Sequence, residues 1–94
     1  MIHIANYIDG KLVSPINDQY LDNYNPATGK VYSYIPDSTG DDVQLAVDAA
    51  RKAFPSWSNL SNIQRSKWLE KISSGIKAKL DELALAESID NGKP

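Results

Sequence analysis

The feature that most constrains the fold is a turn-forming stretch at residues 24–31, which reads YNPATGKV. Pro26 fixes its own φ and disfavours the helical region for Asn25, so Asn25 suits the last position of a strand. The Asn25 side chain can bond the backbone that follows it, and Gly29 can adopt the positive φ that folds the chain back. The flanking segments have strand character, so this stretch predicts the closed end of a β-hairpin.

A second hairpin is predicted upstream, at residues 7–13. Asp9-Gly10 is a favoured type I′ turn pair and has apolar residues on both sides. The polar, proline-containing residues 14–19 predict a loop to the next strand. Residues 1–36 are therefore expected to be β, with two hairpins in series.

The strand that returns from the main turn is predicted to end at Pro36. A period of two places Val31, Ser33 and Ile35 on one face, and Tyr32 and Tyr34 on the other. The tyrosines of this hairpin could form a binding stripe, but cross-strand packing is the favoured interpretation.

The helical half of the chain has a clear start signal. Ser38 or Thr39 can accept hydrogen bonds from the first free N–H groups, and Asp41 and Asp42 place negative charge in the first turn. Apolar residues then recur at helical spacing, at Val43, Ala46, Val47, Ala50 and Phe54. Pro55 is expected to end this helix, with a connector after it.

A second helical region is predicted from Ser61, which has Gln64 three residues on and so matches a capping box. Gly75 weakens the middle of this region by roughly 1 kcal/mol relative to Ala. We therefore expect a bend, or two helices joined near Ala78. An Asn-Gly pair at residues 91–92 predicts the end of the helical region.

Composition excludes several function classes. The net charge of −2 offers no long-range attraction to nucleic acid or to an anionic membrane. The chain has no cysteine, hence no thiol nucleophile, and its one histidine, His3, has no metal-binding pattern around it. No glycine-rich phosphate loop occurs. No residue set here could perform catalysis alone, and without a signal-peptide pattern or a long apolar run we expect a soluble, cytoplasmic protein.

Five segments occur in order between residues 7 and 94. They are Tyr7–Lys11, Tyr24–Val31, Asp41–Phe54, the helix around Arg65, and Glu87–Pro94. In this order they resemble the (Y/F)I(N/D)G, NPATGEV, DVxxAVxAARxAF, ERSxxL and ExxDNGKP segments of NAD(P)+-dependent aldehyde dehydrogenases. Residues 6–11 and 53–58 are most similar to the branch acting on 2-aminomuconic or hydroxymuconic semialdehyde, although betaine-aldehyde-type members are similar here too.

The resemblance implies an α/β fold in which residues 1–94 form the N-terminal portion of a cofactor-binding domain, with no second domain. Hairpins would occupy residues 1–36, and two to three helices residues 38–92. Members of the family oxidise aldehydes to carboxylic acids with a cysteine thiolate and NAD or NADP. Because the catalytic and cofactor-binding segments would lie beyond this stretch, we expect no catalytic or cofactor-binding residue here and no activity of the segment alone.

The resemblance also implies partners and one partial site. The partners would be the remainder of the chain and, in a homodimer or homotetramer, further copies, without nucleic acid or membrane. Many members bind Na+ or K+ through main-chain carbonyls before the Asn-Pro turn and through a later aspartate. The matching positions are Asn23 and Tyr24, with the aspartate beyond Pro94, and carbonyl oxygens suit such ions. Two ordinary strand residues are the alternative interpretation.

The hairpins and helices present more one-sided apolar surface than so short a chain can easily cover. A segment of a larger fold is therefore expected. The alternative is a stand-alone small α+β binding or interaction module, which would have to cover its apolar faces internally.

Overall fold

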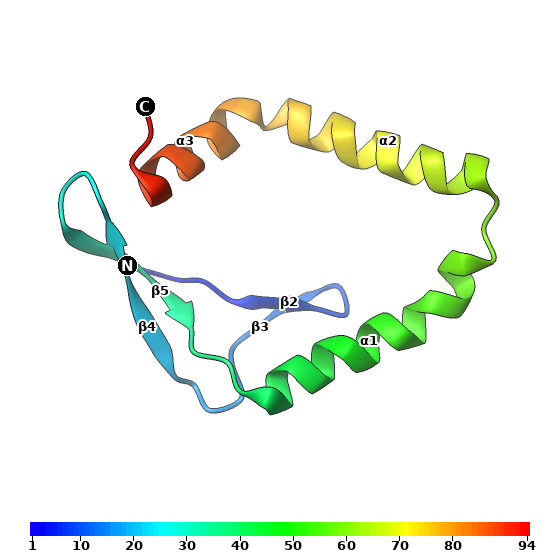
Figure 1. The fold of residues 1–94 in the computed structure, drawn as a ribbon, viewed down its shortest axis with the longest axis horizontal. Coiled ribbons are helices and arrows are strands. Elements are labelled where there is room, and N and C mark those ends of the chain that lie inside the picture. Colours follow the sequence, from blue (N-terminus) through cyan, green and yellow to red (C-terminus); the bar gives the residue numbers. More distant parts are fainter.

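The computed structural model describes all 94 residues as short strands followed by helices (Figure 1). The strands are β1 (Ile2–His3), β2 (Asn6–Ile8), β3 (Lys11–Val13), β4 (Tyr20–Asn25) and β5 (Lys30–Pro36). The helices are α1 (Gly40–Ser58), α2 (Asn62–Ala78) and α3 (Leu80–Asn91). This arrangement confirms the expected α/β class, with hairpins first and three helices after them.

Both predicted hairpins are present, in two separate sheets. β2 and β3 form a two-stranded antiparallel sheet, and β4 pairs with β5 in a three-stranded sheet of order β1-β5-β4. No sequence pattern predicted β1, which pairs in parallel with β5 so that Ile2 lies opposite Ser33. A two-residue strand has too few residues to show a pattern, and its partner is remote in sequence.

The turn chemistry is as predicted. Asp9 and Gly10 both have positive φ, 53° and 75°, as a type I′ turn requires. In the main turn, Asn25 Oδ1 accepts a hydrogen bond from the Ala27 amide at 3.0 Å, and the Asn25 carbonyl accepts one from the Gly29 amide at 2.8 Å. Gly29 has φ 68°, so a side chain there would strain the backbone.

The strict alternation predicted for the returning strand is wrong at a β-bulge. Asn23 pairs with Ser33 but Tyr24 pairs with Val31, which leaves Tyr32 as the extra residue. The Asn23 amide nitrogen is 3.0 Å from Ser33 Oγ and 3.2 Å from the Tyr32 hydroxyl, so these two side chains share a face. Val31 pairs with Tyr24, the residue after Asn23, and therefore lies on the opposite face of the sheet from Asn23. The predicted end of this strand, at Pro36, is confirmed.

The expected end of the first helix at Pro55 is wrong, because α1 continues to Ser58. A proline removes one donor but leaves the carbonyls of the last turn in place. Here two side chains bond these carbonyls. The Ser56 hydroxyl donates to the Ala53 carbonyl at 3.0 Å, and the Ser58 hydroxyl donates to the Pro55 carbonyl at 3.1 Å. These bonds stabilise the turn that follows the proline.

The other helix boundaries agree with the sequence. The Ser61 hydroxyl accepts from the Gln64 amide at 3.2 Å, and the Gln64 side chain accepts from the Ser61 amide at 2.9 Å, which completes the capping box. α2 ends at Ala78 and α3 begins at Leu80, where a division was expected. Gly92 adopts φ 79° and ends α3.

The helices form an open arc that leaves the sheets at the start of α1 and returns to them at the end of α3 (Figure 1). The radius of gyration is 16.8 Å, whereas a compact domain of this length has about 12 Å. The accessible surface of 7669 Å² exceeds the roughly 5,400 Å² of a compact protein of this mass. The three buried residues are Pro15, Ser33 and Asp42, which make no apolar core, and on α2 Ile63 is 71% exposed and Trp68 51%. The apolar faces are therefore not covered internally, contrary to the alternative of a self-contained module.

None of the three helices has the length and apolar content that crossing a membrane requires.

Asp42 connects the first helix to the loop between β3 and β4. Its carboxylate accepts hydrogen bonds from the backbone amides of Thr39 and Ile16, each at 2.9 Å, and the residue is only 4% exposed. The Thr39 amide, and after it the Ile16 amide, lowers the pKa of Asp42. A lowered pKa stabilises the folded state above the ordinary acidic range, and this contribution is lost as the pH falls through the lowered value.

We expect Asp42→Ala to release the loop from α1, because the Ile16 amide loses its acceptor. Amide hydrogen exchange at Ile16 should accelerate by about tenfold or more, since a bond to a charged acceptor is lost. Asp41→Ala is the matched control, because Asp41 lies in the same helical turn without such a bond. Equal exchange rates at Ile16 in the two variants would contradict the role given to Asp42.

Candidate functional site

The most connected group of side chains lies where the end of α3 meets the β4–β5 hairpin (Figure 1). We call it the hairpin–helix junction, and it consists of Asn23, Tyr32, Ser33 and Asp90. The Tyr32 hydroxyl donates to Asp90 Oδ1 at 2.6 Å, and Asn23 Nδ2 donates to the same oxygen at 3.0 Å. One carboxylate oxygen of the helix is thus held by two donors of the hairpin.

Asn23 organises the hairpin side of the junction. Its amide nitrogen faces three acceptors, namely the Asp90 carboxylate, the Ser33 hydroxyl and the Tyr32 hydroxyl. An amide has two hydrogens, so at least one of them is shared. Ser33 is almost fully buried, with 2% of its surface exposed. The bulge at Tyr32 is what aligns the phenol with this group, since a regular strand would point it to the opposite face.

A close backbone approach lies beside these polar contacts. Gly92 has φ 79°, and a Cβ on it would stand 3.0 Å from Pro26 Cγ. The end of α3 therefore abuts the main turn at a position where a side chain would need the proline ring to shift and would strain the backbone. As a result, two of the segments that carry the family resemblance, YNPATGKV and DNGKP, meet in space. The sequence showed them only as two separate ends of elements.

The hydrogen bonds perturb both titrating groups of the junction. The hydrogen bond from Tyr32, followed by the one from Asn23, lowers the pKa of Asp90. The bond to Asp90 is also the main cause that raises the pKa of Tyr32. The Asp90 contribution to stability is lost as the pH falls through its lowered pKa, and the Tyr32 contribution as the pH rises through its raised one. The junction is therefore strongest between about pH 4 and pH 10.

The arrangement can hold elements together, but it contains no nucleophile next to a base. No group of three or more His, Cys, Asp or Glu side chains could hold a metal ion. His3 packs against two tyrosine rings. The centroid of its ring is 4.7 Å from that of Tyr20 and 4.9 Å from that of Tyr34. Of the two positions predicted for a monovalent cation, Asn23 is in the junction, and Tyr24, on the other face of the strand, is 54% exposed.

The roles of Asp90 and Tyr32 were not predicted from the sequence. One signal points to Asp90, which lies in the last turn of α3, where the helix dipole disfavours a carboxylate. An acid at such a position calls for a specific partner. Tyr32 gave no signal, because a bulge depends on the pairing of two strands and not on one strand alone.

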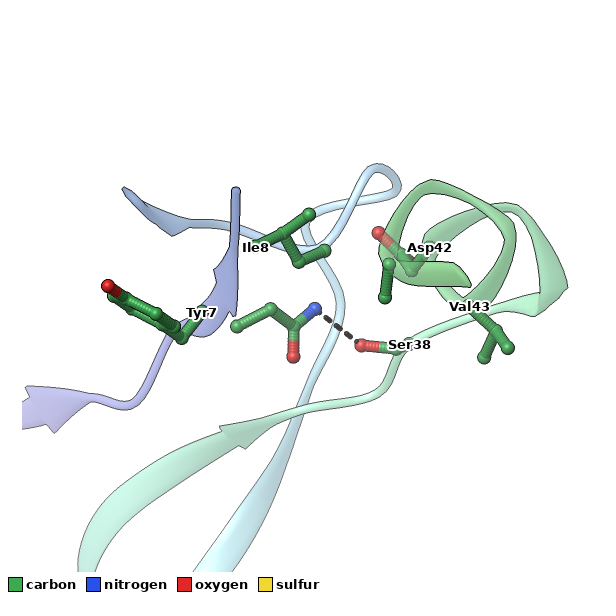
Figure 2. Close-up of a pocket in the computed structure, with 7 residues that line it drawn as sticks. Tyr7, Ile8, Ser38, Asp42 and Val43 are labelled. Carbon is green, nitrogen blue, oxygen red and sulfur yellow. Dashed lines mark hydrogen bonds between the residues drawn. The ribbon is translucent and has the colours of Figure 1, made fainter. Parts of the chain in front are cut away.

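Apart from the junction, a shallow depression of about 190 Å³ lies between β2 and the start of α1 (Figure 2). Asn6 Nδ2 donates to Ser38 Oγ across it at 2.8 Å, and Figure 2 shows Ile8 and Asp42 on the same side of this bond. The depression is open and its polar groups bond each other, so it joins a strand to a helix and presents no reactive group.

We expect Tyr32→Phe to raise the pKa of Asp90 towards its ordinary value, because the hydroxyl is the main group that lowers it. The measurement is an NMR titration of the Asp90 side-chain carboxyl carbon. Tyr24→Phe, on the neighbouring strand and without a side-chain bond to Asp90, should leave the titration unchanged. An unchanged Asp90 titration in Tyr32→Phe would refute the assigned cause.

Comparison with known proteins places this geometry in a family. The model of the aldehyde dehydrogenase family matches residues 13–94. An aldehyde dehydrogenase of Deinococcus radiodurans is 46% identical over 89 residues, which cover 95% of this chain and 17% of that protein. Human 2-aminomuconic semialdehyde dehydrogenase is 44% identical over 93 residues, covering 99% of this chain and 19% of that protein.

A solved structure shows the same backbone. The NAD-dependent aldehyde dehydrogenase of Sinorhizobium meliloti superposes with a TM-score of 0.90 at 38% identity, covering 98% of this chain and 19% of that one. The chain thus spans about a fifth of the length of these relatives. The family match over most of the chain and the shared backbone agree, and the chain belongs to the aldehyde dehydrogenase family.

Proposed function

We propose that this chain is the N-terminal portion of the cofactor-binding domain of an enzyme that oxidises aldehydes to carboxylic acids with NAD or NADP. Family membership supports the reaction class, and the NAD dependence of the Sinorhizobium meliloti relative supports a nicotinamide cofactor. A 2-aminomuconic semialdehyde dehydrogenase and a long-chain-aldehyde dehydrogenase of Acinetobacter are 44% and 45% identical to this chain, so the proposal extends to aldehydes as a class. Its immediate partner is the remainder of such a chain, in a homodimer or homotetramer.

The observation that carries the proposal is the missing apolar core. The chain exposes about 2,300 Å² more surface than a compact protein of its mass. One side of a large obligate interface contributes about 1,000–2,500 Å². The excess is therefore of the size that a permanent partner covers. The exposed apolar side chains of α2, which we call its apolar stripe, give it the right chemistry; they are Ile63, Trp68, Leu69, Ile72 and Ile76. Burial of this stripe is the main gain available when the segment docks.

In this role the segment supplies surface and no chemistry of its own. It has no cysteine, so the thiolate that the family uses would come from another part of the enzyme. Its polar contacts lie at Asp42 and at the hairpin–helix junction. They hold the strands and helices in the relative positions in which they would dock on the partner surface.

We test the proposal by replacing the matched segment of the Sinorhizobium meliloti enzyme with this chain. The hybrid should reduce NAD when an aldehyde is supplied, whereas this chain alone and the relative without its segment should not. Ile72→Asp in the hybrid should weaken docking by about 2 kcal/mol or more, because a large apolar side chain is lost from the interface.

Lys67→Asp is the matched control for this change, since it alters charge on the same helix and, unlike a change at Lys71, leaves the surroundings of the Trp68 ring intact. Activity and assembly are read together, by NADH absorbance and by size-exclusion chromatography. A well-assembled hybrid that tolerates Ile72→Asp as well as Lys67→Asp would show that the exposed face of α2 is not an internal interface, and would overturn the proposal.

We further propose that the main-chain carbonyls of Asn23 and Tyr24 contribute to a Na+ or K+ site of the complete enzyme. The register of the β4–β5 ladder shifts between these two residues, and a ladder disrupted at a bulge can leave carbonyl oxygens free. In the hybrid, exchange of Na+ or K+ for a large organic cation at equal ionic strength should lower the thermal midpoint. An identical midpoint in all three salts would refute the site.

A further inference from the structure

The arc of helices returns to the sheet through very few contacts. Between the helical end of the chain and the β4–β5 hairpin, the direct side-chain hydrogen bonds are those of Asp90 to Asn23 and Tyr32. The bonded residues are 67 and 58 positions apart in sequence. No apolar side chain of the three helices is fully buried, and Ile89, which is half-buried beside Asn25 and Ala27, is the main apolar contact of α3 with the turn.

The geometry of this contact is specific. The Tyr32 hydroxyl and the Asn23 amide converge on one oxygen of Asp90, and Ser33, which is buried, bonds the same amide. A bond between an ionised acceptor and a hydroxyl is stronger than a neutral one, and its 2.6 Å length is typical of this class. Beside it, Gly92 lies against Pro26, so that a Cβ at Gly92 would stand 3.0 Å from Pro26 Cγ.

We propose that Asp90, Tyr32 and Asn23 form a clasp that closes the arc and sets the position of α3 on the hairpin within this chain itself. The clasp acts before any partner surface is met. It reduces the number of arrangements in which α1, α2 and α3 can present their apolar faces, so the segment reaches a partner with less conformational entropy left to lose.

The clasp predicts that the helicity of α3 and its attachment to the hairpin can be changed separately. Asp90→Ala removes an acid from the end of a helix and adds a strong helix former, so α3 itself should be as helical as before or more so. Its attachment to the hairpin should nevertheless be lost. A purely structural loss of the helix would instead lower the helical signal.

The test uses the fact that the chain has no cysteine. Thr28→Cys places a single nitroxide label on the main turn, and paramagnetic broadening of the α3 amides reports how close the helix is. The broadening should be present in the labelled chain and largely lost in Asp90→Ala and Tyr32→Phe. Circular dichroism measures helicity in parallel, and nuclear Overhauser contacts across the paired residues Leu21 and Ile35 report that the hairpin persists.

Tyr24→Phe is the matched control, since this tyrosine lies on the same hairpin, is 54% exposed and has no side-chain hydrogen bond to α3. It should keep the broadening. The proposal is overturned if α3 is not broadened in the labelled parent chain, or if Asp90→Ala and Tyr32→Phe broaden α3 as strongly as Tyr24→Phe does. Because this readout needs neither cofactor nor aldehyde, its failure is distinct from a failure of the hybrid enzyme.

Discussion

The main constraint on this structure is that the chain buries too little apolar surface to form a core of its own. Hydrophobic burial is the main favourable term in folding, and a chain of 94 residues can build a core only if its elements pack in layers. Here the helices follow one another around an arc, so each keeps an apolar stripe uncovered. The same deficit explains why relatives with this backbone are about five times longer.

With no apolar core, polar contacts determine the internal arrangement. Asp42 attaches the loop at Ile16 to the start of α1, Ser38 is bonded to β2, and Asp90 attaches α3 to the hairpin. Each of these contacts joins the helical part to the β part, and each uses a short, directional bond. Directional bonds specify position well but contribute little net stability, because water competes for the same groups. This balance is consistent with the proposal that the chain docks on a larger partner surface.

Local elements could be predicted from the sequence because their causes are local. The type I′ turn at Asp9, the turn that ends with Gly29 and the capping box at Ser61 each involve residues within a few positions of one another. Two predictions failed because groups outside the predicted pattern changed the outcome. α1 passes Pro55 because serine hydroxyls bond the last carbonyls, and Tyr32 changes face because the partner strand imposes a bulge.

By itself, the sequence determined the order of hairpins and helices, most of their ends and the resemblance to a family, since all of these depend on neighbouring residues and on motif order. Only the tertiary structure decided which distant groups meet. The pairing of β1 with β5 and the convergence of Tyr32 and Asn23 on Asp90 are set by chain closure over dozens of residues. Such contacts leave no period or spacing in the sequence, because their geometry exists only after the intervening elements have folded.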